Sequence, residues 1–171
     1  MSIDAPSPVQ LRQWADDDLE TLRRSNTAEM TEFLGGPESD EALAARHARY
    51  LRLWEEGTAR MFRVVTPDHP EGVGTIGTWA DGHHDGALET GWSIETAHQG
   101  RGLATAALRA VLDDARATHG AVAVYAYPRV NNAASNAICR KVGFTLEGEE
   151  EFEYPKGNWE TSNVWVHRPA G

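Results

Sequence analysis

Three stretches of the chain place apolar residues three and four positions apart, which is the spacing of an amphipathic helix. They cover residues 40–56, 103–119 and 132–142. Ser39 precedes the first stretch as an N-cap, and a glycine follows each of the three as a C-terminal stop. A short helix is also predicted around Leu19 and Leu22, behind the acidic run 16–18, and a second short helix over 26–33.

The remaining apolar positions alternate with polar ones or form short runs, which predicts β-strands. The expected strands are 9–14, 60–66, 73–79, 87–94, 121–127, 144–146, 152–154 and 162–167. A predicted turn at 68–72 and a polar loop at 81–86 join three of these strands into an antiparallel meander. The almost wholly apolar run 121–127 is typical of a strand that is buried on both faces.

Length and composition limit the class of protein. The chain has 171 residues and 40% hydrophobic content, which predicts one domain over residues 1–171 with a sizeable core. A formal net charge of −10 argues against nucleic acid or an anionic membrane surface as the main partner and suits a cationic substrate such as an amine. Residues 1–8 show no signal-peptide pattern and no 18-residue apolar run occurs, so we expect a cytoplasmic protein.

The stretch 98–105 carries the clearest candidate chemistry. Gly100 and Gly102 stand between a predicted strand and the helix over 103–119, an arrangement that presents unpaired backbone N–H groups and the positive end of the helix dipole to an anion. Arg101 adds a formal positive charge. The alternative is a tight connection without a ligand. No Gly-Lys-Ser/Thr follows, which excludes a Walker loop, and no acidic residue ends a further strand, which disfavours a dinucleotide fingerprint.

Two motifs resemble one known family. Gln99-x-x-Gly102-x-Ala104 is similar to the acyl-CoA pyrophosphate loop of the GNAT N-acetyltransferases. Asn132-x-x-Ser135, followed by Lys-x-Gly-Phe at 141–144, resembles the branch that includes the ribosomal-protein N-terminal acetyltransferases. The order of predicted elements agrees over nearly the whole chain. The resemblance implies an α+β fold with α/β/α layers, four main helices and a mixed, mostly antiparallel twisted sheet of about seven strands, with a V-shaped splay between the fourth and fifth strands.

The resemblance also implies acetyl-CoA as co-substrate and places it on this chain. Pantetheine would bond to the exposed strand backbone, as an added strand does, and a backbone N–H near Ser93 or Ile94 would polarise the thioester carbonyl. The pyrophosphate would lie on the N–H groups of the glycine loop, and Asn132 would bind the pantetheine arm or simply cap its helix. The implied cofactor-binding residues are Trp92, Ser93, Ile94, Gln99, Gly100, Arg101, Gly102, Leu103, Ala104, Thr105 and Asn132.

Three side chains are candidates for catalysis. Glu89 would take the proton of the acceptor ammonium, or alternatively be a structural carboxylate paired with Arg12 or the backbone. Ser135 would lie near the CoA sulfur and donate to the departing thiolate, or be a small residue that permits close helix packing. Cys139 stands where many GNAT enzymes carry a tyrosine acid. A thiol has a usable pKa, but a small buried hydrophobe is the other interpretation.

The acceptor side is less well marked. Four apolar side chains, Trp14, Met30, Phe33 and Trp159, are expected to line its cleft. Glu151 and Glu160 are weaker candidates for contact with the acceptor. The histidines at 83, 84 and 98 match no common ligand spacing, so no metal is expected.

The sequence therefore predicts an N-acyltransferase that moves an acetyl group from acetyl-CoA to the primary amine of a protein N-terminus or a small molecule, as a monomer or homodimer. A succinyl group remains an alternative to acetyl. Its free carboxylate would need a cation near the thioester, and none is obvious in the motif. Two other classes remain. One is a non-catalytic acyl-CoA sensor, and the other is a nucleotide-binding domain that uses the glycine turn alone.

Overall fold

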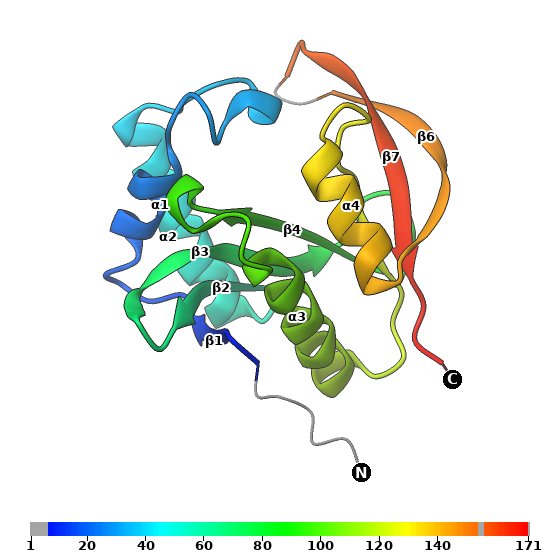
Figure 1. Ribbon diagram of the computed structural model, residues 1–171, viewed down its shortest axis with the longest axis horizontal. Helices are drawn as coiled ribbons and strands as arrows, with labels where there is room; N and C mark the ends of the chain where they lie inside the picture. Colours follow the sequence, from blue (N-terminus) through cyan, green and yellow to red (C-terminus); the bar gives the residue numbers. More distant parts are fainter. Residues whose placement is uncertain (1–6, 154–155, 171) are drawn as a thin grey trace.

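Seven strands form one twisted sheet in this computed structural model, which describes residues 7–153 and 156–170 (Figure 1). Their spatial order is β1-β2-β3-β4-β5-β7-β6, and every neighbouring pair is antiparallel except β4 and β5, which are parallel. The strands are β1 Gln10–Gln13, β2 Ala59–Thr66, β3 His69–Ala80, β4 Leu88–Ile94, β5 Val124–Ala126, β6 Thr145–Glu153 and β7 Trp159–His167.

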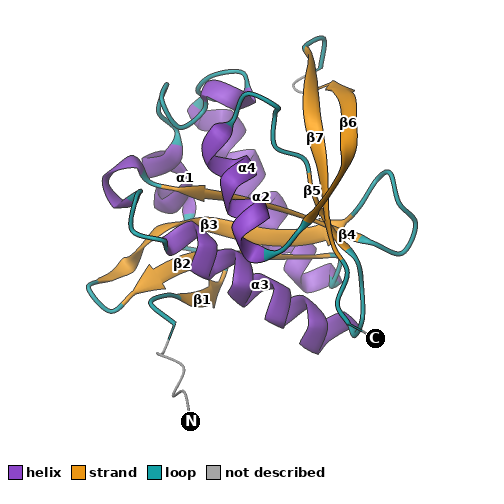
Figure 2. Cartoon of the chain, turned by 45° about the vertical axis from the view of Figure 1, so that its right-hand side comes forward, coloured by secondary structure: helices purple, strands orange, loops and turns teal. Residues whose placement is uncertain are grey.

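Helices cover both faces of the sheet (Figures 1 and 2). They are α1 Leu19–Ser25, α2 Asp40–Glu56, α3 Leu103–His119 and α4 Ala133–Val142. Successive residues of a strand point to opposite faces, so Met61 packs with α1 and α2 in one apolar cluster while Phe62 packs with α3 in another. The predicted α/β/α layering is confirmed. No helix in the described part of the chain has the length and apolarity that a bilayer-crossing span requires.

The parallel pair β4–β5 is short. Its register joins Leu88 to Val124 and Glu89 to Tyr125, and the two strands share no further pairs in the part of the chain that the structure describes. β5 is correspondingly shorter than the predicted run 121–127. The two strands therefore diverge towards the C-terminal end of β4, which is the V-shaped splay expected between the fourth and fifth strands.

The longest predicted helices are found as expected, and one short prediction is wrong. α2 and α3 have the predicted bounds, the Ser39 side chain caps α2, and Gly57 ends it in the left-handed region. The stretch 26–33 is not an α-helix: it forms turns that lead into a 3-10 turn at Glu32–Leu34. The cause is tertiary, because the Asn26 side chain both donates to and accepts from the backbone of Glu38 at 2.8 Å, which draws the segment into a closed loop.

The hairpins also differ from expectation. The predicted turn at 68–72 is wrong, since β3 begins at His69 and Thr66 pairs directly with it across a two-residue turn. The two predicted strands at 144–146 and 152–154 are one strand, β6. Its acidic residues are exposed on both faces of a hairpin, so apolar and polar positions do not alternate along it. Tyr154 lies outside the described residues, and β7 begins at Trp159, three residues earlier than predicted.

A buried asparagine that the sequence did not single out ties α4 to the sheet. The Asn136 amide nitrogen donates to the backbone oxygens of Arg129 and Asn132, at 2.9 and 2.8 Å. Its amide oxygen accepts from Asn163 Nδ2 and Trp165 Nε1, both at 2.8 Å. All the hydrogen-bonding capacity of this side chain is used, so it fixes the start of α4 against β7.

Replacing Asn136 with alanine should lower the free energy of unfolding by about 2–3 kcal/mol, because buried donors and acceptors lose their partners. Urea unfolding at equilibrium measures the change. The exposed neighbour Asn131 is the control, and its replacement by alanine should change stability by no more than about 0.5 kcal/mol. Equal losses in the two variants would contradict a special role for Asn136.

Candidate active site

Backbone polar groups of β4 face the opening between the diverging strands. On the side of β4 that faces β5, Leu88 N–H donates to Ala123 O at 2.9 Å. On the opposite side, which faces β3, Glu95 N–H donates to Val73 O at 2.8 Å. Backbone groups alternate sides along a strand, so even-numbered residues of β4 direct their N–H and C=O groups away from β3. This edge can pair with the amides of a pantetheine arm.

The same alternation separates the two expected oxyanion donors. Ser93 is the register partner of Thr75, so its backbone bonds belong to β3. The N–H groups of Trp92 and Ile94 instead point to the open edge. A thioester carbonyl lying along β4 would therefore meet these two N–H groups, while the Ser93 side chain faces the α1–α2 side of the sheet.

The glycine loop 98–102 is anchored to the end of β4. Gln99 Nε2 donates to Ile94 O at 2.8 Å, which explains a glutamine at this position of the motif. Gly100 and Gly102 have φ values of 78° and 75°, in the left-handed region that glycine adopts without strain. A Cβ built on either glycine would meet nothing within 4 Å, so the space in front of the loop is open.

The first turn of α3 leaves backbone donors available. Gly102 is its N-cap, and the first helical bond runs from Ala106 N–H to Gly102 O at 3.1 Å. The N–H groups of residues 103–105 therefore have no partner within the helix. Together with the exposed Arg101 and the helix dipole, they offer hydrogen-bond donors and positive charge to an anion.

The start of α4 lies on the other side of the splay (Figure 1). Asn132 is its N-cap, and the side-chain oxygen accepts from Ser135 N–H at 3.2 Å. The capping interpretation is thus realised, and this bond leaves the Asn132 amide nitrogen available for a ligand. Ser135 is half-buried in the first turn, and Asn136 holds this turn in place.

Cys139 is placed one turn further, inside the main apolar core. Its exposed fraction is 0%, and burial raises the pKa of the thiol to about 12. A thiol of that pKa is a poor donor to a thiolate of ordinary basicity. The geometry favours the small-hydrophobe interpretation over that of a general acid.

Glu89 is a half-buried carboxylate on β4 beside the splay. Trp79, its register partner on β3, donates from Nε1 to Glu89 Oε2 at 3.0 Å. Burial raises the pKa of Glu89, the negative charge of Asp81 raises it further, and the bond from Trp79 opposes the rise. The predicted alternative, pairing with Arg12, is not realised, because that guanidinium donates to Gln10 on the edge strand.

A second polar cluster lies on the same face of the sheet as Glu89. The Asp81 side chain is fully buried and accepts from Tyr127 Oη at 2.9 Å, and His84 Nδ1 lies 2.6 Å from its Oδ2. The His84 ring stacks on Tyr125 with a centroid separation of 3.8 Å. Burial and the bond to Asp81 raise the pKa of Tyr127, so this hydroxyl stays protonated. Sequence patterns predict only a polar loop at 81–86 and do not indicate this cluster.

A cavity of about 330 Å³ lies on the α1–α2 side of β4. Of the four predicted acceptor residues, Met30 lines it. Trp14 does not, since it is only 2% exposed and donates from Nε1 to His47 Nδ1 at 2.9 Å. Phe33 is half-buried in the 3-10 turn beside the cavity. Trp159 is 63% exposed at the start of β7.

The two glutamates that are weaker candidates for acceptor contact lie on neighbouring strands of the β6–β7 hairpin. Glu151 pairs in register with Thr161 and is exposed, and Glu160 approaches Arg129 at 3.7 Å. Neither belongs to the lining of the 330 Å³ cavity.

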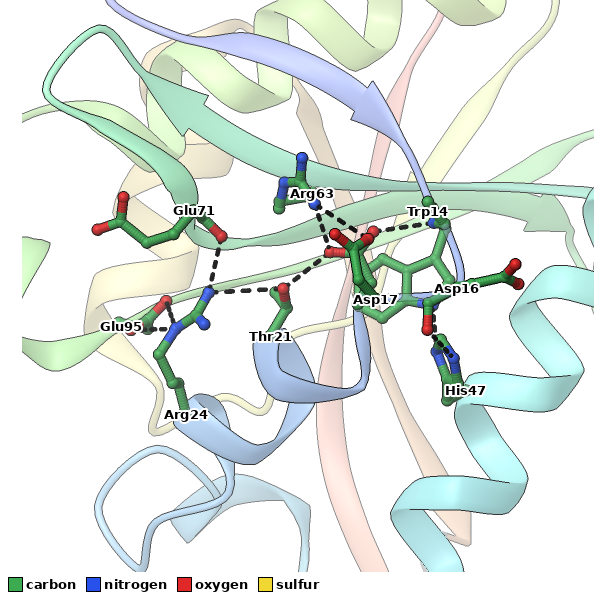
Figure 3. A network of polar contacts seen from close by, with 11 residues as sticks. Trp14, Asp16, Asp17, Thr21, Arg24, His47, Arg63, Glu71 and Glu95 are labelled. Carbon is green, nitrogen blue, oxygen red and sulfur yellow. Dashed lines mark hydrogen bonds and ion pairs between the residues drawn. The ribbon is translucent and has the colours of Figure 1, made fainter.

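One wall of the cavity is α1, which a polar network fixes to the sheet (Figure 3). Arg24 donates from Nε to both Glu95 carboxylate oxygens at 3.2 Å and from Nη2 to the backbone oxygen of Glu71 at 2.9 Å. The buried Asp18 accepts from Thr21 Oγ1 at 2.9 Å and from Arg63 Nη1 at 3.0 Å. These contacts hold α1 over the end of β4, so the cavity is preformed.

The histidines do not gather into a metal site. His98 contacts the ring of His69 at 4.4 Å, whereas His83 packs on Tyr127 and Phe152. Within residues 7–153 and 156–170, no group of three His, Cys, Asp or Glu side chains is arranged to hold a metal ion.

Several known proteins are similar to this chain in sequence or in fold. A relative from Bacillus subtilis (strain 168), the uncharacterized N-acetyltransferase YoaA, is 27% identical over 159 residues that cover 91% of this chain and 90% of the relative. Among solved structures, an acetyltransferase from Salmonella typhimurium that modifies the N-terminal serine of the 50S ribosomal subunit protein L7/L12 has a TM-score of 0.80 and 22% identity, with 96% of each chain covered.

A second solved structure is RimL, a ribosomal L7/L12 alpha-N-protein acetyltransferase, in complex with coenzyme A. It has a TM-score of 0.79 and 21% identity and covers 95% of this chain and 94% of its own. At these identities the solved structures establish the shared fold. The family assignment comes from the sequence, in which the acetyltransferase (GNAT) domain matches residues 9–145. The chain belongs to the GNAT acetyltransferase family and is an acetyltransferase.

Proposed function

We propose that this enzyme transfers the acetyl group of acetyl-CoA directly to the primary amine of a protein N-terminus or of a small molecule, with Glu89 as the base. The observation that carries this proposal is the half-buried Glu89 carboxylate on β4, next to the strand edge that diverges from β5. Burial keeps its pKa above the ordinary value, which makes it a better proton acceptor than an exposed glutamate.

In the proposed reaction Glu89, directly or through one water molecule, takes a proton from the acceptor ammonium. The freed amine attacks the thioester carbonyl carbon, and a C–N bond forms. The N–H groups of Trp92 and Ile94 stabilise the negative charge that develops on the carbonyl oxygen. The C–S bond then breaks, and the nitrogen gives its second proton to water. The CoA thiolate gains a proton from Ser135, which water reprotonates, or directly from water.

The position of Ser135 supports its role at the leaving group. It lies in the first turn of α4, across the splay from β4, and its backbone is held by the Asn132 cap. A hydroxyl can donate to a thiolate and take the replacement proton from water. Acetyl is the proposed donor group, because no cation that would bind the free carboxylate of a larger acid is obvious in the motif near the thioester.

The release of free CoA thiol with a panel of amines tests the proposed function. Wild-type protein should release CoA from acetyl-CoA at a rate that rises with amine concentration and saturates. Binding of acetyl-CoA without amine-dependent release would instead indicate the sensor. Equal affinity for an adenine nucleotide without the pantetheine arm would indicate the nucleotide-binding domain.

The pH dependence of catalysis should follow the groups around Glu89. The bond from Trp79 favours the carboxylate, so Trp79→Phe raises the Glu89 pKa and moves the acidic limb of the kcat/KM profile to higher pH. Asp81→Asn removes a negative charge and moves the same limb to lower pH. Profiles of kcat/KM for wild type and both variants measure the shifts. Two shifts of the same sign would exclude Glu89 as the titrating base.

A further inference from the structure

The loop between α1 and α2, residues 26–38, forms the largest part of the wall of the 330 Å³ cavity. Seven of the twelve lining residues belong to this loop, among them Met30, Leu34 and Pro37. On the side of the sheet the cavity reaches Ser93, which shares its face of β4 with Glu89. The placement of the 26–38 loop therefore sets the space that an acceptor amine finds beside the proposed base.

The 26–38 loop is held together by its own hydrogen bonds. Thr31 Oγ1 donates to Thr27 O at 2.6 Å, and Met30 N–H donates to Thr27 Oγ1 at 3.1 Å. Gly36 N–H donates to Thr31 O at 3.0 Å. In the described part of the chain, every hydrogen bond of residues 27–37 has its partner within the same stretch. These bonds fix the shape of the loop, but they do not attach it to the rest of the protein.

One side chain closes the base of the loop. Asn26 Nδ2 donates to Glu38 O, and Asn26 Oδ1 accepts from Glu38 N–H, both at 2.8 Å. Asn26 directly follows the last residue of α1, and Glu38 directly precedes Ser39, the N-cap of α2. Glu38 is also fixed to α2, because its Oε1 lies 2.7 Å from Arg46 Nη2. The Asn26 amide therefore joins the end of one helix to the start of the next.

The coenzyme side of the site does not depend on this closure. Gln99 anchors the glycine loop to Ile94, and α3 packs on the opposite face of the sheet from α2. Among the described residues, no hydrogen bond joins the 26–38 loop to residues 92–105. Loss of the Asn26 contacts should therefore affect the acceptor and leave acetyl-CoA binding unchanged.

We propose that Asn26 is a positioning residue for the acceptor: its amide keeps the 26–38 loop closed over the cavity and so sets the affinity for the amine without touching it. This inference rests on the proposed function of the same site. A loop that is closed for only part of the time lowers the apparent affinity in proportion to the closed fraction. The closed complex that reacts is the same in both cases, so kcat is kept.

Asn26→Ala removes both bonds to Glu38 and tests the proposal. With L-alaninamide and benzylamine as separate probes, KM for the amine should rise about tenfold, and kcat should stay within about twofold of wild type. The Kd of acetyl-CoA, measured by calorimetric titration, should also stay within about twofold. Glu29→Gln is the control, because Glu29 is an exposed residue of the same loop and does not line the cavity. It should leave all three quantities unchanged.

Three kinetic results would overturn the proposal. The first is an unchanged KM in Asn26→Ala. The second is a fall in kcat, or a Kd of acetyl-CoA that rises as much as KM, because Asn26 would then support the whole site. The third is an equal rise of KM in Glu29→Gln, because any change in the loop would then have this effect. Thermal unfolding of each variant verifies that the fold is intact.

Hydrogen exchange of single backbone amides, measured by NMR, separates a failure of this inference from a failure of the proposed function, because it needs no turnover. In Asn26→Ala the Glu38 N–H loses its acceptor and should exchange faster, whereas the Gly36 N–H keeps its bond to Thr31 O and its rate. This result supports the inference even if wild type releases no CoA with any amine. An unchanged rate at Glu38 overturns it even if wild type acetylates amines. Faster exchange at both amides also overturns it, because the loop then unfolds instead of opening as a unit.

Discussion

Acetyl-CoA should raise the melting temperature of the wild-type protein by about 5–10 °C at a concentration near 100 times its Kd, and should raise that of Gly102→Glu by less than about 1 °C. A ligand that binds only the folded state stabilises it by about 2.7 kcal/mol at this concentration. The variant puts a carboxylate beside the N–H groups of residues 103–105, where the pyrophosphate would lie. The two anions repel each other, and the glutamate occupies the open space.

A matched variant separates this effect from backbone strain. Gly57 has a φ of 71° and Gly102 a φ of 75°, and a Cβ on either meets nothing within 4 Å. Gly57 ends α2, remote from the loop in sequence and on the opposite face of the sheet. Gly57→Glu should lose stability through the same left-handed strain but keep the full rise with acetyl-CoA. A full rise in Gly102→Glu would place acetyl-CoA elsewhere.

The parts of the fold that the sequence predicted well are those with local signals. α2 carries a capping serine and a terminal glycine, and α3 has one continuous apolar face, so both were predicted to the residue. The segment 26–33 was predicted wrongly because its conformation depends on bonds between Asn26 and Glu38, twelve residues away. Helical spacing does not encode such a contact.

The same distinction applies to the site. The glycine loop and the Asn132 cap are short-range motifs that have a direct geometric meaning, and the structure has them in the expected conformation. The aromatic side chain of Trp14 favours a cleft residue. In the structure it is buried, and it donates a hydrogen bond to His47, which lies 33 residues away in the sequence. Ser25 Oγ and Arg46 Nε are buried without a hydrogen-bond partner among the described residues, and no sequence signal marks them, because only the packed structure shows which partners a polar atom has.

Replacing Glu89 with glutamine should lower kcat/KM by about 10²–10⁴-fold, the usual contribution of a positioned general base. Glutamine has the same shape and still offers an oxygen to Trp79 Nε1, so the packing of β3 and β4 is kept. It cannot accept a proton from an ammonium ion at neutral pH. The acidic limb of the wild-type kcat/KM profile against pH, which reports the pKa of Glu89, should be absent from the residual activity of the variant.

The control for this variant is Glu149→Gln, a charge removal of the same kind on the exposed β6–β7 hairpin, which should keep its activity. The rise in melting temperature with acetyl-CoA should be equal in wild type and Glu89→Gln, because the glycine loop and the open edge of β4 are unchanged. Loss of that rise would mean that Glu89 supports CoA binding instead of proton transfer. Full activity in Glu89→Gln would move the base to another group on the same face, and His84, whose Nδ1 lies 2.6 Å from the buried carboxylate of Asp81, is then the next side chain to replace.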